Sequence, residues 1–402
     1  MTPPTGPVHL RQVRTGNLQA LLTALLEGPA SRAELAQRIG LTKATIANLV
    51  EPLLRQRILI EDDLVNTGRG RPSRPLRFSD EAPVAVGAEI NVRHLAVTVQ
   101  RLDGSIAADA RIDLDNRRRA ADDLIDRLAE LIRAALTESG CEPLGIGLAV
   151  PGIMHADTVV HAPNVPSLTG VRIGDRLASA LGAPTVLVDN EANLAALAHV
   201  WPRRLAGDDF VYVSGDVGIG AGIILDGTLF RGRSGFAGEL GHVVIERAGR
   251  PCTCGSQGCV EQYAGLQAIL TAAGQPRLDS LCDALRAGDI RTRSAVNCAG
   301  SALGVALSSL VNLCDVGTIV LGGSYTRFFD DLVPGVRAEL GTGVLAATKR
   351  PTTLAASPLG SAAVSRGAAA LITRHCCLTP QLLLAPDQPA PVSLSGDRYS
   401  RE

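Results

Sequence analysis

The stretch Gly238-Glu-Leu-Gly-His242, followed by Cys252-Thr-Cys254-Gly-Ser-Gln-Gly-Cys259, decides how this 402-residue sequence is interpreted. It places three thiols within eight residues of a glycine-rich loop, with one imidazole ten residues before the first of them. Thiolates together with an imidazole suit tetrahedral zinc, and four protein ligands leave no open position for a catalytic water. The ligands would be His242, Cys252, Cys254 and Cys259.

The same loop carries Gly255 and Gly258, which supply the backbone freedom that a chain wrapping around an ion needs. The sequence therefore predicts one structural zinc ion. The alternative is that the cysteines are reduced thiols in the core and that His242 is a hydrogen-bonded polar residue.

The composition around this stretch is that of a globular protein, with 46% hydrophobic and 20% charged residues, and the length suggests two or three domains. Residues 1–9 lack the basic start and the apolar core of a secretory signal, and we expect no run of about 18 uncharged apolar residues. Nine cysteines at scattered spacings argue against a disulfide framework. We therefore expect a soluble, cytoplasmic protein that has no membrane segment.

Charge is distributed unevenly along the chain. Residues 1–77 carry 11 basic and 6 acidic side chains, a net charge of +5, so the remainder must carry −6 of the total of −1. A basic N-terminal segment on an acidic body is typical of a segment that contacts phosphates.

Three helices are expected within this N-terminal segment. Leucines recur at helical spacing over Asn17–Glu27, and a Gly-Pro pair follows. Ser31 and Glu34 form a capping box for a second helix, which should end at Gly40, and Thr42 caps a third helix. The inward stripe of that third helix is Ile46, Leu49, Val50 and Leu53. A short helix, a glycine turn and a capped helix form the helix-turn-helix pattern, whose second helix lies in the major groove.

Two short strands, residues 58–61 and 76–78, should follow and flank a basic loop over Gly68–Pro75, which we interpret as a wing. Any three-helix segment with a solvated basic loop could mimic this pattern. The agreement of caps, helix spacing and wing favours DNA binding. The DNA-contacting candidates are Thr42, Lys43, Ala44, Thr45, Asn48, Arg69, Arg71 and Arg74.

The body repeats one plan twice. Strands over 84–90 and 95–101 and a turn at Asp103-Gly104 lead into a third strand, and strands over 210–213 and 220–225 and a turn at Asp226-Gly227 do the same. Later elements are expected at 121–136 (a helix), and at 144–150, 185–188 and 318–321 (strands). Duplicated halves predict a cleft between them.

This plan divides the chain into four parts. They are a winged helix-turn-helix domain (residues 1–80), a first α/β lobe (81–200), a second α/β lobe that carries the zinc loop (201–378) and a C-terminal tail (379–402). The tail is rich in proline and polar residues, and we expect it to be loosely ordered.

At this point the chain resembles the ROK family of bacterial sugar kinases and sugar-responsive repressors, over almost its whole length. The matching motifs are Gly232–His242, Cys252–Glu261, Val150-Pro-Gly152 with Pro163-Asn164, Asp189–Asn193 and Ile319–Gly323. The resemblance implies the duplicated actin-like ATPase fold, which agrees with the repeat described above.

The resemblance also implies a sugar-binding set, which maps onto Asn164, Asn190, Glu191, Glu239, His242 and Glu261. Carboxylates and amides offer the paired acceptors and donors that vicinal hydroxyls require, and buried polar groups left unpaired reject the wrong stereoisomer. Since three members bracket the zinc loop, the metal would orient this set and perform no chemistry.

Kinases of the family carry a first phosphate loop of the type Asp-x-Gly-Gly-Thr, in which glycines let backbone N–H groups close on phosphate. The corresponding residues here are Glu89-Ile-Asn91-Val92-Arg93, and Val217 stands where the second loop has a threonine. The catalytic-base position holds Glu191, where aspartate is usual; glutamate can still accept a proton. Because the first phosphate loop lacks both glycines and the second lacks its threonine, we predict no enzyme activity.

The resulting hypothesis is a transcription repressor that binds operator DNA and senses a sugar or sugar phosphate, as a homodimer or dimer of dimers reading palindromic half-sites. One alternative is an active ATP-dependent sugar kinase with an appended DNA-binding head. Another is a scaffold or constitutive DNA binder that has no ligand.

Overall fold

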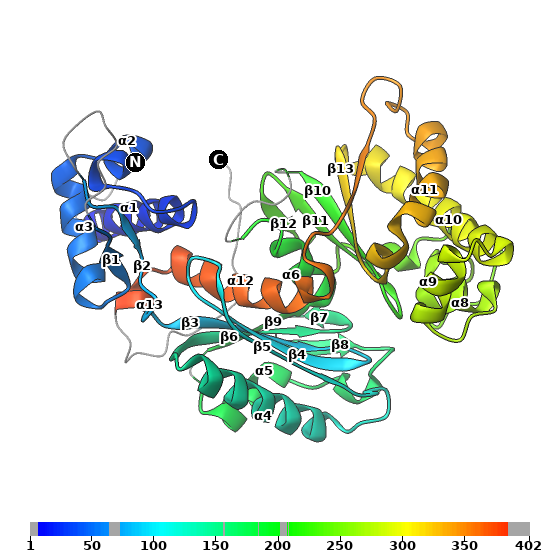
Figure 1. The fold of residues 1–402 in the computed structure, drawn as a ribbon, viewed down its shortest axis with the longest axis horizontal. Coiled ribbons are helices and arrows are strands. Elements are labelled where there is room, and N and C mark those ends of the chain that lie inside the picture. Colours follow the sequence, from blue (N-terminus) through cyan, green and yellow to red (C-terminus); the bar gives the residue numbers. More distant parts are fainter. Residues whose placement is uncertain are drawn as a thin grey trace.

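The computed structural model describes residues 7–384 except 64–72, 156, 184, 202–206 and 208, with side chains from residue 12 onward. An N-terminal helical domain lies at one end of an elongated molecule, and two α/β lobes follow (Figure 1).

The N-terminal domain holds the three expected helices, α1 (Pro7–Leu26), α2 (Arg32–Ile39) and α3 (Lys43–Arg55). The predicted capping box is present, since the Ser31 hydroxyl accepts the Glu34 N–H and the Glu34 carboxylate accepts the Ser31 N–H at 2.7 Å. Gly40 ends α2 at φ 68°, and the Thr42 hydroxyl accepts the Thr45 N–H. Helix α1 begins ten residues before the predicted start, in a stretch where no leucine pattern marks it.

Strands β1 (Leu59–Glu61) and β2 (Leu76–Phe78) pair antiparallel after α3. Ala30, between α1 and α2, also pairs with Leu76, which extends this small sheet toward the helices. The predicted inward stripe of α3 is buried as a whole. The three predicted helices and the two strands that flank the predicted wing are thus confirmed, whereas residues 68–72 of the predicted wing loop lie outside the described residues.

The two lobes contain sheets of the same strand order, which confirms the duplicated architecture. In each sheet the first three strands are antiparallel and the last two extend it in parallel. The first sheet runs β5 (Ile106–Asp113), β4 (His94–Gln100), β3 (Val84–Ile90), β6 (Pro143–Val150), β9 (Val186–Asn190). The second runs β12 (Thr228–Phe230), β11 (Ile219–Leu225), β10 (Phe210–Gly215), β13 (Thr318–Gly323), β14 (Thr353–Ala356).

Helices cover these sheets and a short hairpin flanks the first (Figure 1). On the first lobe these are α4 (Ala121–Ser139), α5 (Ile173–Leu181) and the hairpin β7–β8 (Ile153–His155 and Thr158–His161). On the second they are α7 (Glu261–Ala264), α8 (Leu266–Ala273), α9 (Leu278–Arg286), α10 (Ile290–Cys314) and α11 (Phe329–Gly343).

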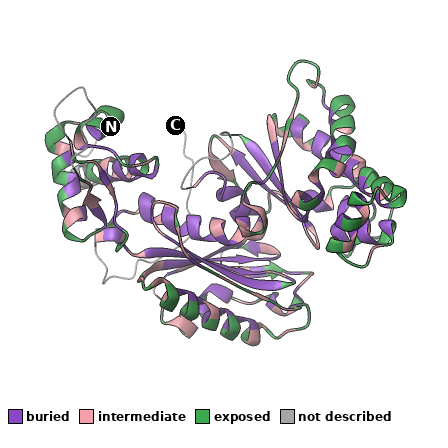
Figure 2. Ribbon diagram, viewed as in Figure 1, coloured by how far each residue is buried: buried purple, intermediate pink, exposed green. Residues whose placement is uncertain are grey.

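Two helices, α6 (Glu191–Leu197) and α12 (Ala363–Leu378), lie between the sheets and are buried along much of their length (Figure 2). Helix α12 follows the second sheet in the chain but packs on the first, because Gly87 and Gly147 let its backbone approach. A Cβ atom at Gly87 would lie 1.8 Å from the Ser365 carbonyl oxygen. Helix α6 in turn packs on β11, where a Cβ at Gly222 would lie 2.5 Å from the Ala192 carbonyl. Each of these helices thus belongs to one predicted lobe by sequence and packs on the sheet of the other.

One hydrophobic core joins the N-terminal domain to the body. It contains Leu21 and Leu22 of α1, Leu371 and Ile372 of α12, and Leu383 of the short helix α13 (Gln381–Leu384). Hydrogen bonds reinforce it, from the Gln56 side chain to the Leu384 carbonyl and from the Gln381 side chain to the Thr15 hydroxyl, both 2.8 Å long.

The expectation of a loosely ordered tail is therefore wrong for residues 379–384, because α13 docks against the N-terminal helices. The leucines of α13 were not recognised as core residues because residues 385–402, which follow them, are rich in proline. Those last residues lie outside the described part of the chain.

Helix α10 is, among the described helices, the one long and apolar enough by composition to cross a membrane. Residues 294–314 carry no charge, but serines and asparagines interrupt this stretch, so it is not a continuous apolar run. More than half of this window is buried inside the protein, against α11: a Cβ at Gly300 would lie 2.4 Å from the Leu332 carbonyl. The same test is passed by core helices of soluble proteins, and α10 packs as one.

Candidate functional site

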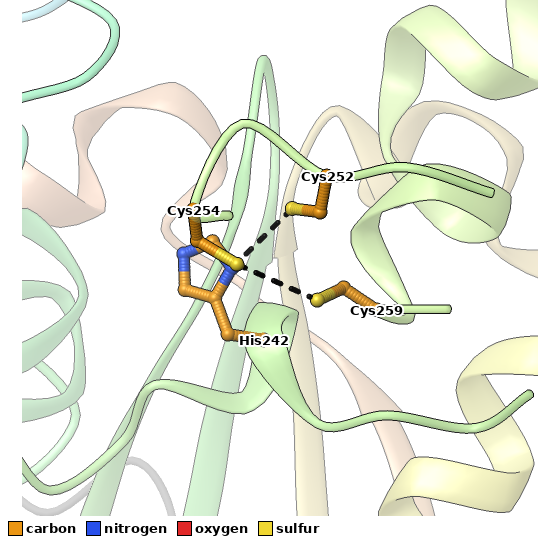
Figure 3. Close-up of side chains that lie close together, drawn as sticks. All are labelled: His242, Cys252, Cys254 and Cys259. Atoms are coloured by element: carbon orange, nitrogen blue, oxygen red, sulfur yellow. Dashed lines mark hydrogen bonds between the residues drawn. The ribbon is translucent and has the colours of Figure 1, made fainter. Parts of the chain in front are cut away.

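Four side chains converge beside the cleft between the lobes: His242, Cys252, Cys254 and Cys259 (Figure 3). Their ligand atoms all lie within 4.8 Å of one another. Cys252 Sγ is 3.8 Å from His242 Nδ1, and Cys254 Sγ is 3.7 Å from Cys259 Sγ. A tetrahedron with zinc–sulfur bonds of about 2.3 Å has edges of about 3.8 Å, so the spacing fits that ion. The four residues could hold a metal ion.

The loop around this cluster is held by its own backbone. A short 3₁₀ helix, Leu240–His242, presents the imidazole, and the Cys252 N–H donates to the Ser256 carbonyl at 2.9 Å. Gly255 and Gly258 adopt φ of 91° and 77°, as expected for a wrapping loop. A Cβ at Gly258 would also lie 1.8 Å from the Glu246 carbonyl, so no larger residue fits.

The crowding of the thiols separates their pKa values. Burial opposes ionisation of Cys252, but hydrogen bonds from the Cys254 backbone and from neighbouring side chains outweigh it and lower its pKa to about 7. Burial raises the pKa of Cys259 to about 12, and the adjacent thiols act in the same direction. A bound divalent cation would favour the thiolate at all three positions.

The cleft itself encloses about 850 Å³, part of it open to solvent. All six residues of the predicted sugar-binding set line it, three from each lobe: Asn164, Asn190, Glu191, Glu239, His242 and Glu261. Sequence reasoning did not single out His161, Asn193 and Thr253, which also line it. Asn193 ends the Asp189–Asn193 motif and could have been found there.

On the first-lobe wall, Asn190 is largely engaged within the protein. Its side-chain oxygen accepts the Ala192 N–H at 2.8 Å and caps α6, and its amide nitrogen donates to the Gly152 carbonyl at 2.8 Å. One amide hydrogen is left for a ligand. Asn190 therefore shapes the wall as much as it offers hydrogen bonds to the cleft.

Glu191 differs from an ordinary surface carboxylate. The residue as a whole is only half-buried, but its Oε2 atom is shielded from solvent and has no hydrogen-bond partner. Burial, together with the negative charges of Glu89 and Asp216, raises its pKa to about 8. Near neutral pH the protonated carboxyl can donate a hydrogen bond to a ligand.

On the second-lobe wall, two carboxylates flank the zinc-ligand loop. Glu261, two residues after Cys259, accepts the Ile219 N–H at 3.0 Å, which ties the loop to β11. Glu239, three residues before His242, borders the open cleft and is exposed there, yet the surrounding protein desolvates it enough to raise its pKa. Glu261 adds to that rise and His242 opposes it.

The segment that corresponds to the first phosphate loop uses its own hydrogen-bond donors internally. The Asn91 N–H donates to the His94 carbonyl at 3.0 Å, and the Arg93 N–H donates to the Asn91 side chain at 3.1 Å. Val92 is buried, and Glu89 lies 3.1 Å from the His94 ring. Two backbone donors of the loop are thus not available to phosphate.

The predicted DNA-contacting residues of α3 lie on its outer face. Thr42, Lys43, Ala44 and Asn48 are exposed and Thr45 is half-buried. Arg74, at the base of the wing, is exposed and lies 3.9 Å from Glu61. Arg69 and Arg71 fall outside the described residues.

Known proteins resemble the chain over most of its length. The xylose repressor of Bacillus subtilis (strain 168) is 28% identical over 372 residues, which cover 90% of this chain and 96% of the relative. A crystal structure of a ROK family transcriptional regulator, a homolog of the E. coli MLC protein, superposes with a TM-score of 0.77 at 24% identity, covering 92% of this chain and 99% of that one.

A ROK family glucokinase from Streptomyces griseus, in complex with glucose and AMPPNP, reaches a TM-score of 0.63 at 26% identity. It covers 72% of this chain and 98% of its own, so the likeness does not extend over the whole chain. A sequence profile of the ROK family matches residues 85–375, which is most of the chain. The chain belongs to the ROK family.

Proposed function

We propose that the chain is a transcription repressor that binds operator DNA through its winged helix-turn-helix domain and responds to a sugar bound between its lobes. The observation that carries the proposal is the convergence of six hydrogen-bonding side chains on one cleft, in a chain that also presents the outer face of α3. The similarity to a xylose repressor supports it, because it extends over 90% of this chain and so includes both the N-terminal domain and the lobes.

The charge of the cleft favours an uncharged sugar over a sugar phosphate. Glu191, Glu239 and Glu261 line it, and among the described residues no lysine or arginine lines it. A phosphate would meet the Glu239 and Glu261 carboxylates, with no cation among the described lining residues to offset its desolvation. Hydroxyl groups can instead bond to the acids, to the Asn164 amide and to His242.

The loop hydrogen bonds support a body that does not transfer phosphate. In addition to the closed Asn91–Arg93 segment, the Asp216 carboxylate accepts the Ser324 N–H at 3.0 Å and the Ser324 hydroxyl at 2.7 Å. The Asp216 carboxylate of the second loop is thus bound by Ser324, the residue that follows β13. The alternative, an ATP-dependent sugar kinase with an appended DNA-binding domain, needs backbone donors that are free to bind phosphate, which the Asn91–Arg93 segment does not offer.

The zinc ion, in this proposal, is structural. It would fix the loop that carries Glu239 and Glu261, so the sugar set would keep its geometry only while the ion is bound. The protein would act in the cytoplasm as a homodimer or dimer of dimers, because one helix-turn-helix buries little DNA and paired heads read two half-sites.

The test uses the full-length protein. Thermal shift is measured with D-xylose, D-glucose and N-acetyl-D-glucosamine and with the corresponding sugar phosphates. Fluorescence anisotropy measures binding of the protein to the DNA upstream of its own gene, with and without each sugar. We expect a neutral sugar to raise the melting temperature and to change the DNA affinity. Glu239→Gln should weaken that response, whereas Glu138→Gln, an exposed change on α4, should not.

Three results would count against the proposal: no salt-dependent DNA binding, no response to any sugar, or sugar-dependent ADP release in a coupled assay with ATP. The last would establish the kinase alternative. The absence of a sugar response combined with tight DNA binding would favour a constitutive DNA binder.

A further inference from the structure

An ion pair crosses from one lobe to the other next to the cleft. Arg231 directly follows β12 at the edge of the second sheet, and Asp189 lies near the end of β9 at the edge of the first. Their Nη1 and Oδ2 atoms are 2.6 Å apart. Neither residue belongs to the predicted sugar-binding set.

Asp189 organises the first-lobe wall of the cleft. Its Oδ1 atom accepts the Asn190 N–H at 2.8 Å and the Asn193 side-chain amide at 3.1 Å, and both of these residues line the cleft. The Asp189 side chain is only 4% exposed, and its Oδ2 atom is shielded from solvent. Within the described part of the chain, Arg231 is the one cation paired with this buried charge.

Arg231 also holds the second-lobe wall. Its carbonyl oxygen accepts the Ala237 N–H at 3.1 Å, which closes the turn that begins at Gly232 with φ 68°. Ala237, Gly238 and Glu239 then line the cleft. A Cβ at Gly238 would lie 2.0 Å from the Ala221 carbonyl, so the turn sits directly on β11.

We propose that Arg231 is a positioning residue for the effector: through Asp189 it fixes the first-lobe wall, and through its own turn it fixes the second, so that both walls face a sugar at a set distance. The inference rests on the proposed sugar response. Its physical basis is that truncating one partner of a buried ion pair leaves the other charge without compensation. The Asp189 carboxylate would then turn toward solvent, and Asn190 and Asn193 would lose the acceptor of their hydrogen bonds.

The experiment compares full-length Arg231→Met, Arg231→Lys and Asp189→Asn/Arg231→Met with the wild type. Arg233→Met is the matched control, since Arg233 lies on the same turn, is exposed and has no ion partner among the described residues. Calorimetry gives the affinity for whichever of D-xylose, D-glucose or N-acetyl-D-glucosamine shifts the wild type most. Amide hydrogen exchange of residues 190–193 and 235–239 is followed without sugar, and bound zinc is counted.

We expect Arg231→Met to weaken sugar affinity at least tenfold and to speed exchange in both segments, with one zinc per chain retained. Arg231→Lys should recover part of the affinity, because it keeps the charge but not the forked geometry. The double variant should lose less than the single one, since it removes the buried charge as well. Arg233→Met should stay within twofold of the wild type.

Wild-type affinity and exchange in Arg231→Met would overturn the inference. If instead the wild type binds no sugar, the proposed function fails on its own terms. The exchange rates in the sugar-free protein still decide whether Arg231 ties the two walls, because faster exchange in Arg231→Met than in Arg233→Met supports the tie and equal exchange refutes it.

Discussion

Gly367 on α12 faces the carbonyl oxygen of Leu194 on α6 so closely that a Cβ atom would lie 1.7 Å from that oxygen. Hence no side chain fits between the helices, and α6 begins at Glu191 in the cleft while α12 reaches the N-terminal domain. The contact therefore joins a helix that begins at the cleft to a helix that also packs against the N-terminal domain.

Gly367→Ala should push α6 and α12 apart and lower the free energy of unfolding by about 3 kcal/mol, the upper part of the range for overpacked cores. Urea unfolding of the purified variant measures it. The control is Gly341→Ala in α11, where a Cβ meets nothing within 4 Å and alanine should be neutral or stabilise by about 0.5 kcal/mol. Equal stability of the two variants would contradict the close approach.

Removal of the metal should loosen the cleft wall. Cys259→Ser is expected to reduce bound zinc from one per chain to none, because a hydroxyl is a poor ligand beside two thiolates, and to lower the melting temperature. Cys298→Ser, an exposed cysteine on α10, should keep the full zinc content. Elemental analysis and thermal melts check both, and zinc retained by Cys259→Ser would refute the ligand assignment.

Glu191 should make the protein less stable as pH rises. Its folded pKa, about 8, lies above the ordinary value of 4.5, so its proton is bound more tightly in the folded state than in the unfolded chain. The resulting stability is complete below pH 4.5 and is lost as pH rises through about 8. Glu191→Gln removes this dependence.

Melting temperatures from about pH 6 to about pH 9 test the point. The wild type should fall relative to Glu191→Gln across this range, while the exposed change Glu138→Gln should run parallel to the wild type. Parallel curves for wild type and Glu191→Gln would mean that the carboxyl is ionised throughout.

DNA binding should depend on the outer face of α3. Lys43→Ala is expected to weaken binding on all sequences and to reduce the slope of log affinity against log salt by about one, as for a phosphate contact, whereas Asn48→Ala should relax specificity at one base pair. Arg55→Ala, exposed at the far end of the same helix, serves as the control. If Lys43→Ala leaves the slope unchanged, α3 is not placed as proposed.

Local signals in the sequence carried most of the secondary structure. Ser31, Thr42 and Gly40 cap or end helices where their chemistry predicts it, and strand β3 has the bounds that its apolar run indicates. The turns at Asp103-Gly104 and Asp226-Gly227 and the strands around them could be predicted for the same reason, because turn geometry and the alternation of apolar and polar residues depend on a few neighbouring residues. The zinc-ligand cluster was found because its four members lie within eighteen residues.

The features that the sequence did not reveal depend on contacts between distant residues. Nothing local in Ala363–Leu378 indicates that this helix returns to the first sheet, and the glycines that admit it, Gly87 and Gly147, lie far earlier in the chain. Arg231 and Asp189 pair across lobes, so neither motif alone discloses the ion pair. Helix α13 was overlooked for a similar reason, since its leucines can be identified as core residues only from their packing against α3.

The core that runs from α1 through α12 to α13 also bears on how such proteins can be recombined. A cut after residue 80 would strip Leu21 and Leu22 of their partners in α12, and would expose apolar surface on both fragments. The DNA-reading domain is thus not an exchangeable cassette. A chimaera that transfers it to another body must carry the last two helices along, so the two ends of the chain would have to be inherited as a pair.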